Sequence, residues 1–268
     1  MIYTNEELKE FFKKLEANDK SRASYALRKL HPYSITKVLE TLSEPFDREV
    51  VAERTAAKYK DTEGHKYSGK EAWEIIQMWE EKSEISRTTG KLLDDYIGAI
   101  LTNSIKSEEI YNSEIAKLHD RQKRFDNFNV LYNEILMPHN FEFVCRELTL
   151  CDGQKFCKGR FDAIFLKGDK ICLFDWKSNE ELSTQNDYGK HMLGPLYKYD
   201  VCDLNGYTLQ LYIYKYILKN VYHIDNEIVP CLCRIGPDKF EIYNHNIEYS
   251  DKLIEQIFKY AKDKLIQK

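Results

Sequence analysis

Two aspartates and a lysine stand close together in a part of the chain that is otherwise apolar. Asp162, Asp175 and Lys177 lie in the run GRFDAIFLKGDKICLFDWK, residues 159–177. Burying charge costs free energy unless the group is paired or binds a metal, so charges among β-prone apolar residues need an explanation. Carboxylates are hard oxygen ligands that suit Mg²⁺ or Mn²⁺. The three residues therefore predict a metal-dependent site, with a structural ion-pair cluster as the alternative.

The spacing of these residues predicts their register. Gly168 and Asp169 form a recognised two-residue hairpin signal between two short apolar runs. With those two residues as the turn, Asp162 lies directly opposite Asp175, and their Cβ atoms are roughly 4.5–5.5 Å apart. By the same count Arg160 lies opposite Lys177 on that face of the sheet. Two carboxylates so close repel one another unless a cation lies between them, so the register also predicts one or two metal ions.

Such a site has the parts needed to cleave a phosphodiester. A bound divalent cation lowers the pKa of a water molecule and neutralises charge on the phosphate. Lys177 follows Asp175 by two residues and so projects to the same face of the strand. Its ammonium group is expected either to orient the attacking water or to stabilise the charge that develops in the transition state.

Two helical patterns add to this segment. Gln210 and Tyr214 are four residues apart and share one helix face, as do Gly90 and Asp94 earlier in the chain. In chain order the patterns are Gly-x-x-x-Asp, Gly-x-x-Asp, Asp-x-Lys and Gln-x-x-x-Tyr. This order resembles the RecB-type branch of the PD-(D/E)xK nuclease superfamily, which includes the mitochondrial genome maintenance exonuclease and nuclease domains of bacterial recombination complexes. The resemblance spans residues 31–235.

The resemblance implies roles for further residues. Metal ligation is implied for Asp94, where many RecB-type members carry His, and for the backbone carbonyl of Trp176; the alternative for Asp94 is a solvated helix-face acid beside Asp95. Contact with the substrate is implied for five residues. For two of them there is an alternative: Tyr214 would be an ordinary core residue, and Gln210 would be a polar residue at the rim of the core. The five residues are Ser34, Thr36, Arg160, Gln210 and Tyr214.

Glu147 is implied as a third catalytic carboxylate. Residues 141–150 alternate well enough to be a strand, and Asp152-Gly153 is a hairpin signal. With that turn Glu147 pairs with Lys158, which leaves it four residues from Asp162, roughly 13 Å along the sheet. A longer loop or a bulge would close this distance.

The composition suits a protein with a real core. The chain has 268 residues, of which 43% are hydrophobic and 13% aromatic, and a net charge of −4. Seven scattered cysteines, with no Cys-x-x-Cys, predict reduced thiols and no iron–sulfur cluster. We find no segment long and apolar enough for a membrane span and expect a cytoplasmic protein, in the host cytoplasm if it is phage-encoded.

The acidic balance does not exclude a nucleic-acid partner, because phosphate binding depends on local patches. Three groups of basic residues are candidates, with solvated helix faces as the alternative. They are Lys9, Lys13 and Lys14; Arg22, Arg28 and Lys29; and Lys117, Arg121, Lys123 and Arg124.

Hydrophobic periodicity predicts the order of elements. Expected helices span 5–17, 22–30, 34–42, 71–101, 113–136, 205–219 and 250–266, and expected strands span 141–150, 156–166, 170–177, 228–235 and 239–243. This order predicts an α/β fold with a restriction-endonuclease-like αβββαβ core, a mixed central sheet and an N-terminal helical elaboration. We expect residues 1–112 to form a helical region that contributes to the active site and residues 113–268 to form the nuclease core.

A long connection separates Lys177 from the helix of Gln210. Residues 178–204 include Tyr188, Tyr197 and Tyr199. Long loops are uncommon unless they are functional, and exposed aromatic rings there would stack on unpaired bases; the alternative is a packed surface loop. Its Met-Leu-Gly-Pro-Leu stretch also resembles nucleases encoded by large phages.

The sequence as a whole predicts a Mg²⁺- or Mn²⁺-dependent deoxyribonuclease. An exonuclease acting on single strands or DNA ends in replication, recombination or repair is the first hypothesis. The expected partners are DNA and proteins of replication or recombination, with no membrane. The alternatives are a structure-selective endonuclease or resolvase, and a catalytically silent nucleic-acid-binding module of the same fold.

Overall fold

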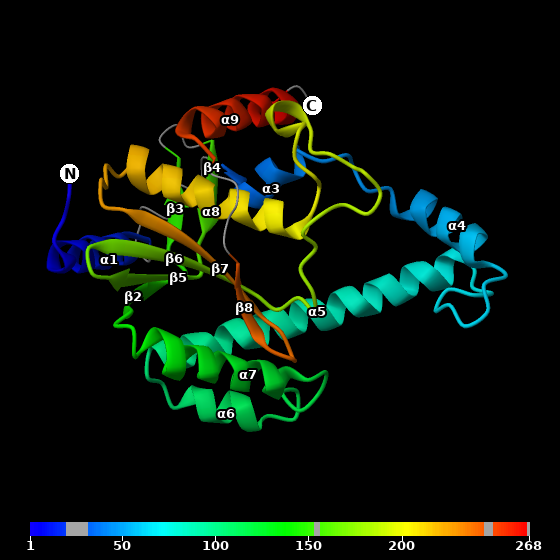
Figure 1. The fold of residues 1–268 in the computed structure, drawn as a ribbon, viewed down its shortest axis with the longest axis horizontal. Coiled ribbons are helices and arrows are strands. Elements are labelled where there is room, and N and C mark those ends of the chain that lie inside the picture. Colours follow the sequence, from blue (N-terminus) through cyan, green and yellow to red (C-terminus); the bar gives the residue numbers. More distant parts are fainter. Residues whose placement is uncertain (20–31, 153–155, 244–248, 267–268) are drawn as a thin grey trace.

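The computed structural model describes residues 1–19, 32–152, 156–243 and 249–266. At its centre is a mixed five-stranded sheet in the order β2 (Glu142–Arg146), β5 (Ala163–Lys167), β6 (Lys170–Lys177), β7 (Ile228–Ile235) and β8 (Phe240–Tyr243) (Figure 1). Strands β6 and β7 are parallel, and the other neighbours are antiparallel. The predicted α/β fold with a mixed central sheet is confirmed.

Helices cover both faces of this sheet. Helices α8 (Asp203–Asn220) and α9 (Asp251–Ile266) lie on one side, and α5 (Ala72–Leu101), α6 (Lys106–Asn112) and α7 (Arg121–Val130) lie on the other (Figure 1). Side chains of a strand alternate between the two faces. Ile171 and Leu173 accordingly enter the core beneath α8, whereas Cys172 and Phe174 enter the core beneath α5 and α7. The same alternation directs Asp175 toward the α8 side.

The hairpin that sets the candidate site has the predicted register. Lys167 pairs with Lys170, and the ladder runs to Ala163 opposite Phe174, so the next positions are Asp162 and Asp175. Gly168 has a φ of +60°, a conformation that is open to glycine at little steric cost. The turn therefore places the two aspartates opposite each other.

Two of the predicted strands break and pass into a second sheet. Residues 141–150 divide into β2 and β3 (Thr149–Cys151), and residues 156–166 divide into β4 (Cys157–Arg160) and β5. Strands β3 and β4 form a three-stranded sheet with the short β1 (Tyr33–Ser34). At the break Glu147 has a φ of +51°, and its N–H donates to the carbonyl of Asp162 at 3.1 Å. Both breaks thus lie side by side.

The breaks correct two predicted pairings. Cys151 pairs with Lys158, so the connection between β3 and β4 is longer than a two-residue turn and moves the register by four positions. Glu147 therefore lies beside Asp162 and not opposite Lys158, and the longer loop closes the expected gap. Arg160 pairs with Thr149 in the second sheet and not with Lys177, because β4 ends before the five-stranded sheet begins.

The N-terminal helices serve two different purposes. Leu8 and Phe12 of α1 (Asn5–Asp19) and Val38 of α3 (Ile35–Glu40) are buried in the core beneath α8. Helix α4 (Arg48–Tyr59) instead packs on the first half of α5, and together they project from the body as an arm (Figure 1).

Some predicted helix bounds are corrected. The sequence did not predict α4 or α6, and α7 begins at Arg121 rather than at 113. It continues into a π-helical segment, η1 (Leu131–Leu136). The predicted helix over 22–30, with its basic residues, lies outside the described residues.

The connection after β6 is partly packed and partly exposed. Met192 is buried, and so is Leu196 of the short 3₁₀ segment η2 (Gly194–Leu196). Tyr188 and Tyr197 are 81% and 62% exposed. The loop is therefore anchored to the body and still presents two aromatic rings to solvent.

Two further findings concern the chain as a whole. All seven cysteines are free thiols. Within the described part of the chain, every helix is too short or too polar to span a bilayer.

Candidate active site at the junction of the two sheets

Asp162 and Asp175 form a close acidic pair. The backbone N–H of Trp176 donates to Asp162 Oδ2 at 2.7 Å, while Asp175 is 1% exposed. Burial, and then the charge of Asp175, raise the pKa of Asp162 to about 8. Two buried carboxylates that share a site resist ionising together. The pair therefore has an excess of negative charge that a cation would relieve.

Lys177 supplies one positive charge to this pair. Its Nζ lies 2.7 Å from Asp175 Oδ2 and 4.3 Å from the ring centre of Tyr207. Burial lowers the pKa of Lys177, but the charges of Asp175 and Asp162 outweigh it, so the pKa is raised. The two carboxylates thus favour the charged form of Lys177.

Asp175 Oδ2 is buried and lies in an ion pair with Lys177. Among the described residues, this oxygen is one of two buried side-chain polar atoms that make no hydrogen bond of normal geometry. The contact with Lys177 is thus an ion pair without a well-directed hydrogen bond. A buried carboxylate oxygen in this condition is a suitable ligand for a hard cation.

Asp94 reaches the same region from α5. Its Oδ2 accepts a hydrogen bond from Arg146 Nη2 at 3.0 Å. Burial raises the pKa of Asp94, and Arg146 opposes this effect, whereas Glu147 adds to it. The charge of Asp94 also raises the pKa of Asp162. Asp94 is thus a partly exposed acid that is paired with Arg146, and its predicted metal ligation stays a prediction.

Glu147 lies at the rim of the acidic group. Its carboxylate is 3.5 Å from Arg146 Nη2 and 3.6 Å from Arg160 Nη1, and its side chain is 44% exposed. Arg160 is itself mostly exposed. Glu147 is therefore near Asp162 through the backbone, while its carboxylate pairs with two arginines.

Tyr214 and Gln210 form one wall behind the aspartates. The hydroxyl of Tyr214 donates to the carbonyl of Arg160 at 2.7 Å, and Gln210 Nε2 donates to that hydroxyl at 3.2 Å. A Cβ on Gly159 would lie 2.7 Å from the Tyr214 hydroxyl, so only glycine leaves room for it. Tyr214 is fully buried, which makes it a core residue beside the site, and Gln210 is the polar residue nearer its surface.

Ser34 and Thr36 lie at the start of α3. Ser34 Oγ accepts the N–H of Lys37 at 3.0 Å and caps this helix. Both side chains are exposed, and Ser34 pairs with Lys158 across the second sheet. The structure thus gives Ser34 a capping role, and its proposed contact with substrate stays a prediction.

Two buried arginines hold the backbone that follows Lys177, and the sequence did not indicate them. Arg124 donates to the carbonyl of Ser178 at 3.3 and 3.4 Å, and Arg234 donates to the carbonyls of Asn179 (3.3 Å) and Glu180. A Cβ on Gly90 would be 3.2 Å from Ser178 Oγ, so α5 also packs closely here. These contacts fix the end of β6 and with it Lys177.

The basic groups predicted from sequence are largely used within the protein. Arg121 is buried and donates to Thr89 Oγ1 at 2.9 Å, and Arg124 is equally buried. Neither belongs to a solvated helix face or to a phosphate-binding patch. Several of the lysines are paired with acidic neighbours, namely Lys9, Lys14, Lys117 and Lys123.

The residues fit a metal site based on two carboxylates. Among the described residues no three Asp, Glu, His or Cys side chains are arranged to hold one ion. Mg²⁺, however, commonly takes one or two protein carboxylates and completes its shell with water and phosphate oxygens. Asp162, with its raised pKa, and Asp175, with its buried carboxylate oxygen, provide that pair.

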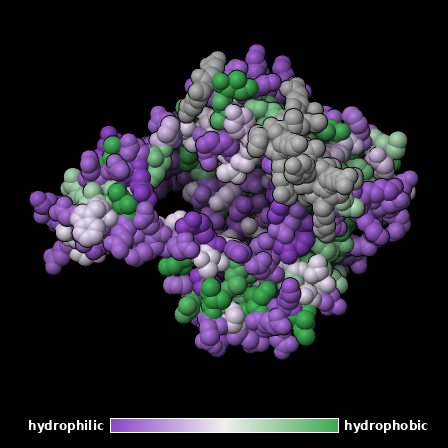
Figure 2. Space-filling view, turned by 180° about the vertical axis from the view of Figure 1, so that it is seen from behind, coloured by the Kyte–Doolittle hydropathy of each residue, from purple (hydrophilic) through white to green (hydrophobic). Residues whose placement is uncertain are grey.

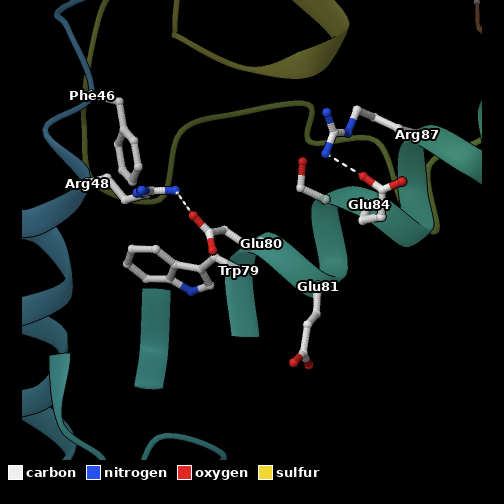
Figure 3. Close-up of a pocket in the computed structure, with 8 residues that line it drawn as sticks. Phe46, Arg48, Trp79, Glu80, Glu81, Glu84 and Arg87 are labelled. Atoms are coloured by element: carbon white, nitrogen blue, oxygen red, sulfur yellow. Dashed lines mark hydrogen bonds and ion pairs between the residues drawn. The ribbon is translucent and has the colours of Figure 1, made fainter. Parts of the chain in front are cut away.

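A cleft lies on the arm, away from the aspartates. Phe46, Arg48 and Trp79 line it with acidic residues of α5, and its volume is about 760 Å³ (Figure 3). Arg48 pairs with Glu80 at 2.6 Å across the opening. Figure 2 shows a hollow with hydrophilic walls between the arm and the body.

Comparisons with solved structures give distant likenesses. No family model matches the chain, and no curated protein does. Among solved structures, a protein from Eubacterium rectale named "Putative exonuclease" is 15% identical with a TM-score of 0.41 over 83% of this chain and 82% of its own. The protein SSO0001 is 18% identical with a TM-score of 0.30 over 72% and 87%. Likenesses at these TM-scores do not establish a shared activity.

Proposed function

We propose that this chain is a metal-dependent nuclease that hydrolyses DNA phosphodiester bonds. The observation that carries the proposal is the buried pair of Asp162 and Asp175 with Lys177 beside it. Charge of both signs is costly to bury, and the pair keeps a carboxylate oxygen without a hydrogen bond. That oxygen is ion-paired with Lys177, and a buried acidic pair with one lysine beside it keeps a negative charge that a divalent cation would relieve.

The protein residues divide the chemistry between them. Asp162 and Asp175 would hold a Mg²⁺ or Mn²⁺ ion, assisted by the carbonyl of Trp176, and the ion would supply an activated water and charge neutralisation. Lys177, which lies beside Asp175, would orient the water or stabilise the non-bridging phosphate oxygens as a cation. The water oxygen bonds to phosphorus as the bond to the 3′ oxygen breaks, which leaves a 5′-phosphate and a 3′-hydroxyl.

An exonuclease on single strands or DNA ends is the kind of nuclease that we favour. The hollow between arm and body has hydrophilic walls (Figure 2), and the loop that follows Lys177 carries the exposed rings of Tyr188 and Tyr197. Exposed rings stack on unpaired bases at about 1–3 kcal/mol per base without regard to sequence. The stacked interior of a duplex would not offer these rings a base face.

Cleavage of labelled DNA tests the proposal directly. Single- and double-stranded substrates carrying 5′ or 3′ labels are incubated with Mg²⁺, Mn²⁺ or EDTA. We expect stepwise shortening of single strands with either metal and none with EDTA. Lys177→Met and Asp175→Asn should each lower kcat at least about 100-fold. Lys170→Met, on an exposed lysine at the other end of β6, is the matched control and should cleave normally.

The same assay separates the alternatives. Internal fragments from the first time points would indicate an endonuclease. Binding of DNA without cleavage under every metal condition would contradict an enzyme and favour a silent binding module. The second alternative has one observation in its favour, since Arg146 already occupies the carboxylate of Asp94.

A further inference from the structure

Arg146 reaches into the acidic group from the end of β2. Its Nη2 lies 3.0 Å from Asp94 Oδ2, 3.3 Å from the Asp94 carbonyl oxygen and 3.5 Å from Glu147 Oε2. The Arg146 side chain is only 20% exposed. One guanidinium group therefore bridges the two carboxylates that lie beyond the Asp162–Asp175 pair.

Helix α5 is shaped to receive this guanidinium. Gly98 lies four residues after Asp94 and so on the same face of the helix. A Cβ at Gly98 would lie 1.1 Å from Arg146 Nη1 and 2.1 Å from its Cζ. The arginine therefore occupies the volume that any other residue at this position would fill. The missing side chain at Gly98 thus leaves the space in which the guanidinium group lies.

The charges of the site nearly balance without a second metal ion. Leaving aside the exposed Asp95, and with every carboxylate ionised, the site contains four carboxylates that influence one another, those of Asp94, Glu147, Asp162 and Asp175. Three cations pair with them, Lys177, Arg146 and Arg160, which leaves one net negative charge. One divalent ion and one phosphodiester together carry a single positive charge and would bring the sum to zero. A second divalent ion would leave an excess of two positive charges.

We propose that Arg146 takes the place of a second metal ion, so that this site binds one divalent cation. Asp162 and Asp175 hold that ion, and Arg146 provides the positive charge on the side of Asp94 and Glu147. The inference rests on the proposed function, in which Asp162 and Asp175 bind metal, and it adds that the number of bound ions is one. A planar guanidinium with fixed donors suits a position between two carboxylates better than a flexible ammonium would.

Counting bound ions tests the inference without measuring cleavage. Metal-free protein is titrated with Mn²⁺, and bound ions per chain are determined by isothermal titration calorimetry and by the loss of the free Mn²⁺ signal in electron paramagnetic resonance. We expect one ion for the wild type and two for Arg146→Met, the second binding at least about tenfold more tightly than any second ion of the wild type. Adding Asp94→Asn to Arg146→Met should return the count to one.

A second variant covers the case in which Arg146→Met does not fold. Gly98→Ala retains the arginine but places a methyl group in its volume, so it should displace the guanidinium and also raise the count to two. Circular dichroism shows which variants are folded. Two ions in the wild type would overturn the inference, as would a count of one in whichever of the two variants is folded.

The outcomes also separate the inference from the proposed function. A wild type that binds one ion and cleaves no DNA, with variants that bind two, would remove the nuclease and leave the role of Arg146. An active wild type whose variants still bind one ion would support the nuclease and contradict the role of Arg146. A wild type that binds no Mn²⁺ at all would overturn both.

Discussion

Asp162→Asn is expected to stabilise the metal-free protein at pH 8 while changing little at pH 4. Burial and the neighbouring Asp175 raise the pKa of Asp162 from its ordinary 3.8 to about 8. Between these values the folded protein binds a proton that the unfolded chain has released. The stability contributed by this proton is fully present below about pH 4 and is lost as the pH rises through about 8. Asparagine has no proton to lose and still accepts the N–H of Trp176.

The size of the stability difference follows from the interval between the two pKa values of Asp162. It spans about four pH units, and each unit corresponds to about 1.4 kcal/mol, which sets an upper limit of about 6 kcal/mol. Asp162 is only partly buried as a residue, and solvent reduces the cost of ionising it. We therefore expect Asp162→Asn to be about 3 kcal/mol more stable than the wild type at pH 8.

Urea unfolding in EDTA at a series of pH values measures this difference. Asp61→Asn is the control, because it removes an exposed carboxylate from the arm and should leave the shape of the pH profile unchanged. Added Mg²⁺ should stabilise the wild type and have little effect on Asp162→Asn. A wild type that gained stability between about pH 5 and pH 8 would refute the assigned environment, as would a variant less stable than the wild type throughout.

Three further substitutions test the support of the site. Gly159→Ala forces a Cβ against the Tyr214 hydroxyl and should cost about 1–3 kcal/mol in chemical denaturation. Tyr214→Phe leaves the carbonyl of Arg160 without its donor and should cost about 1–3 kcal/mol in the same measurement, with no change in fold by circular dichroism. Arg234→Met leaves the carbonyls of Asn179 and Glu180 without their buried donor and should cost about 1–3 kcal/mol, and an equally stable variant would show that this buried arginine is dispensable.

Much of the fold follows from patterns that are local in the chain. The hairpin of Gly168 has its predicted register because a two-residue turn fixes the pairing by counting. Helices α5 and α8 were predicted within a few residues by their apolar periodicity. The weakly patterned α4 and the short α6 were missed, because little of either is buried.

The breaks in the long strands could not be predicted in the same way. A strand that passes from one sheet to another keeps its alternation of apolar and polar side chains. The pattern of residues 141–150 therefore showed no interruption at Glu147, where the strand breaks. The Asp152-Gly153 pair imitated a tight turn and gave a register four positions away from the observed one. A short-range turn signal was overridden by the pairing of β4 with β1.

The arginines of the site were missed for a different reason. Arg124 is held by a carbonyl 54 positions away in the chain, and nothing near it in sequence marks it as buried. A signal for Arg146 was present, however. Gly90, Asp94 and Gly98 are spaced four residues apart and so share one face of the helix. The two glycines have no side chain, which leaves space on either side of Asp94 and indicates that other groups approach the helix closely there.

Helix α5 also fixes the distance between the arm cleft and the candidate site. It carries Trp79 of the arm cleft and Asp94 of the site on one continuous helix. Fifteen residues at 1.5 Å each hold the two about 22 Å apart. A single strand bound at the proposed metal site would have to extend over about seven phosphates, at the spacing of a stacked strand, before it came level with the cleft. A shorter oligonucleotide could therefore occupy the proposed site without reaching the arm.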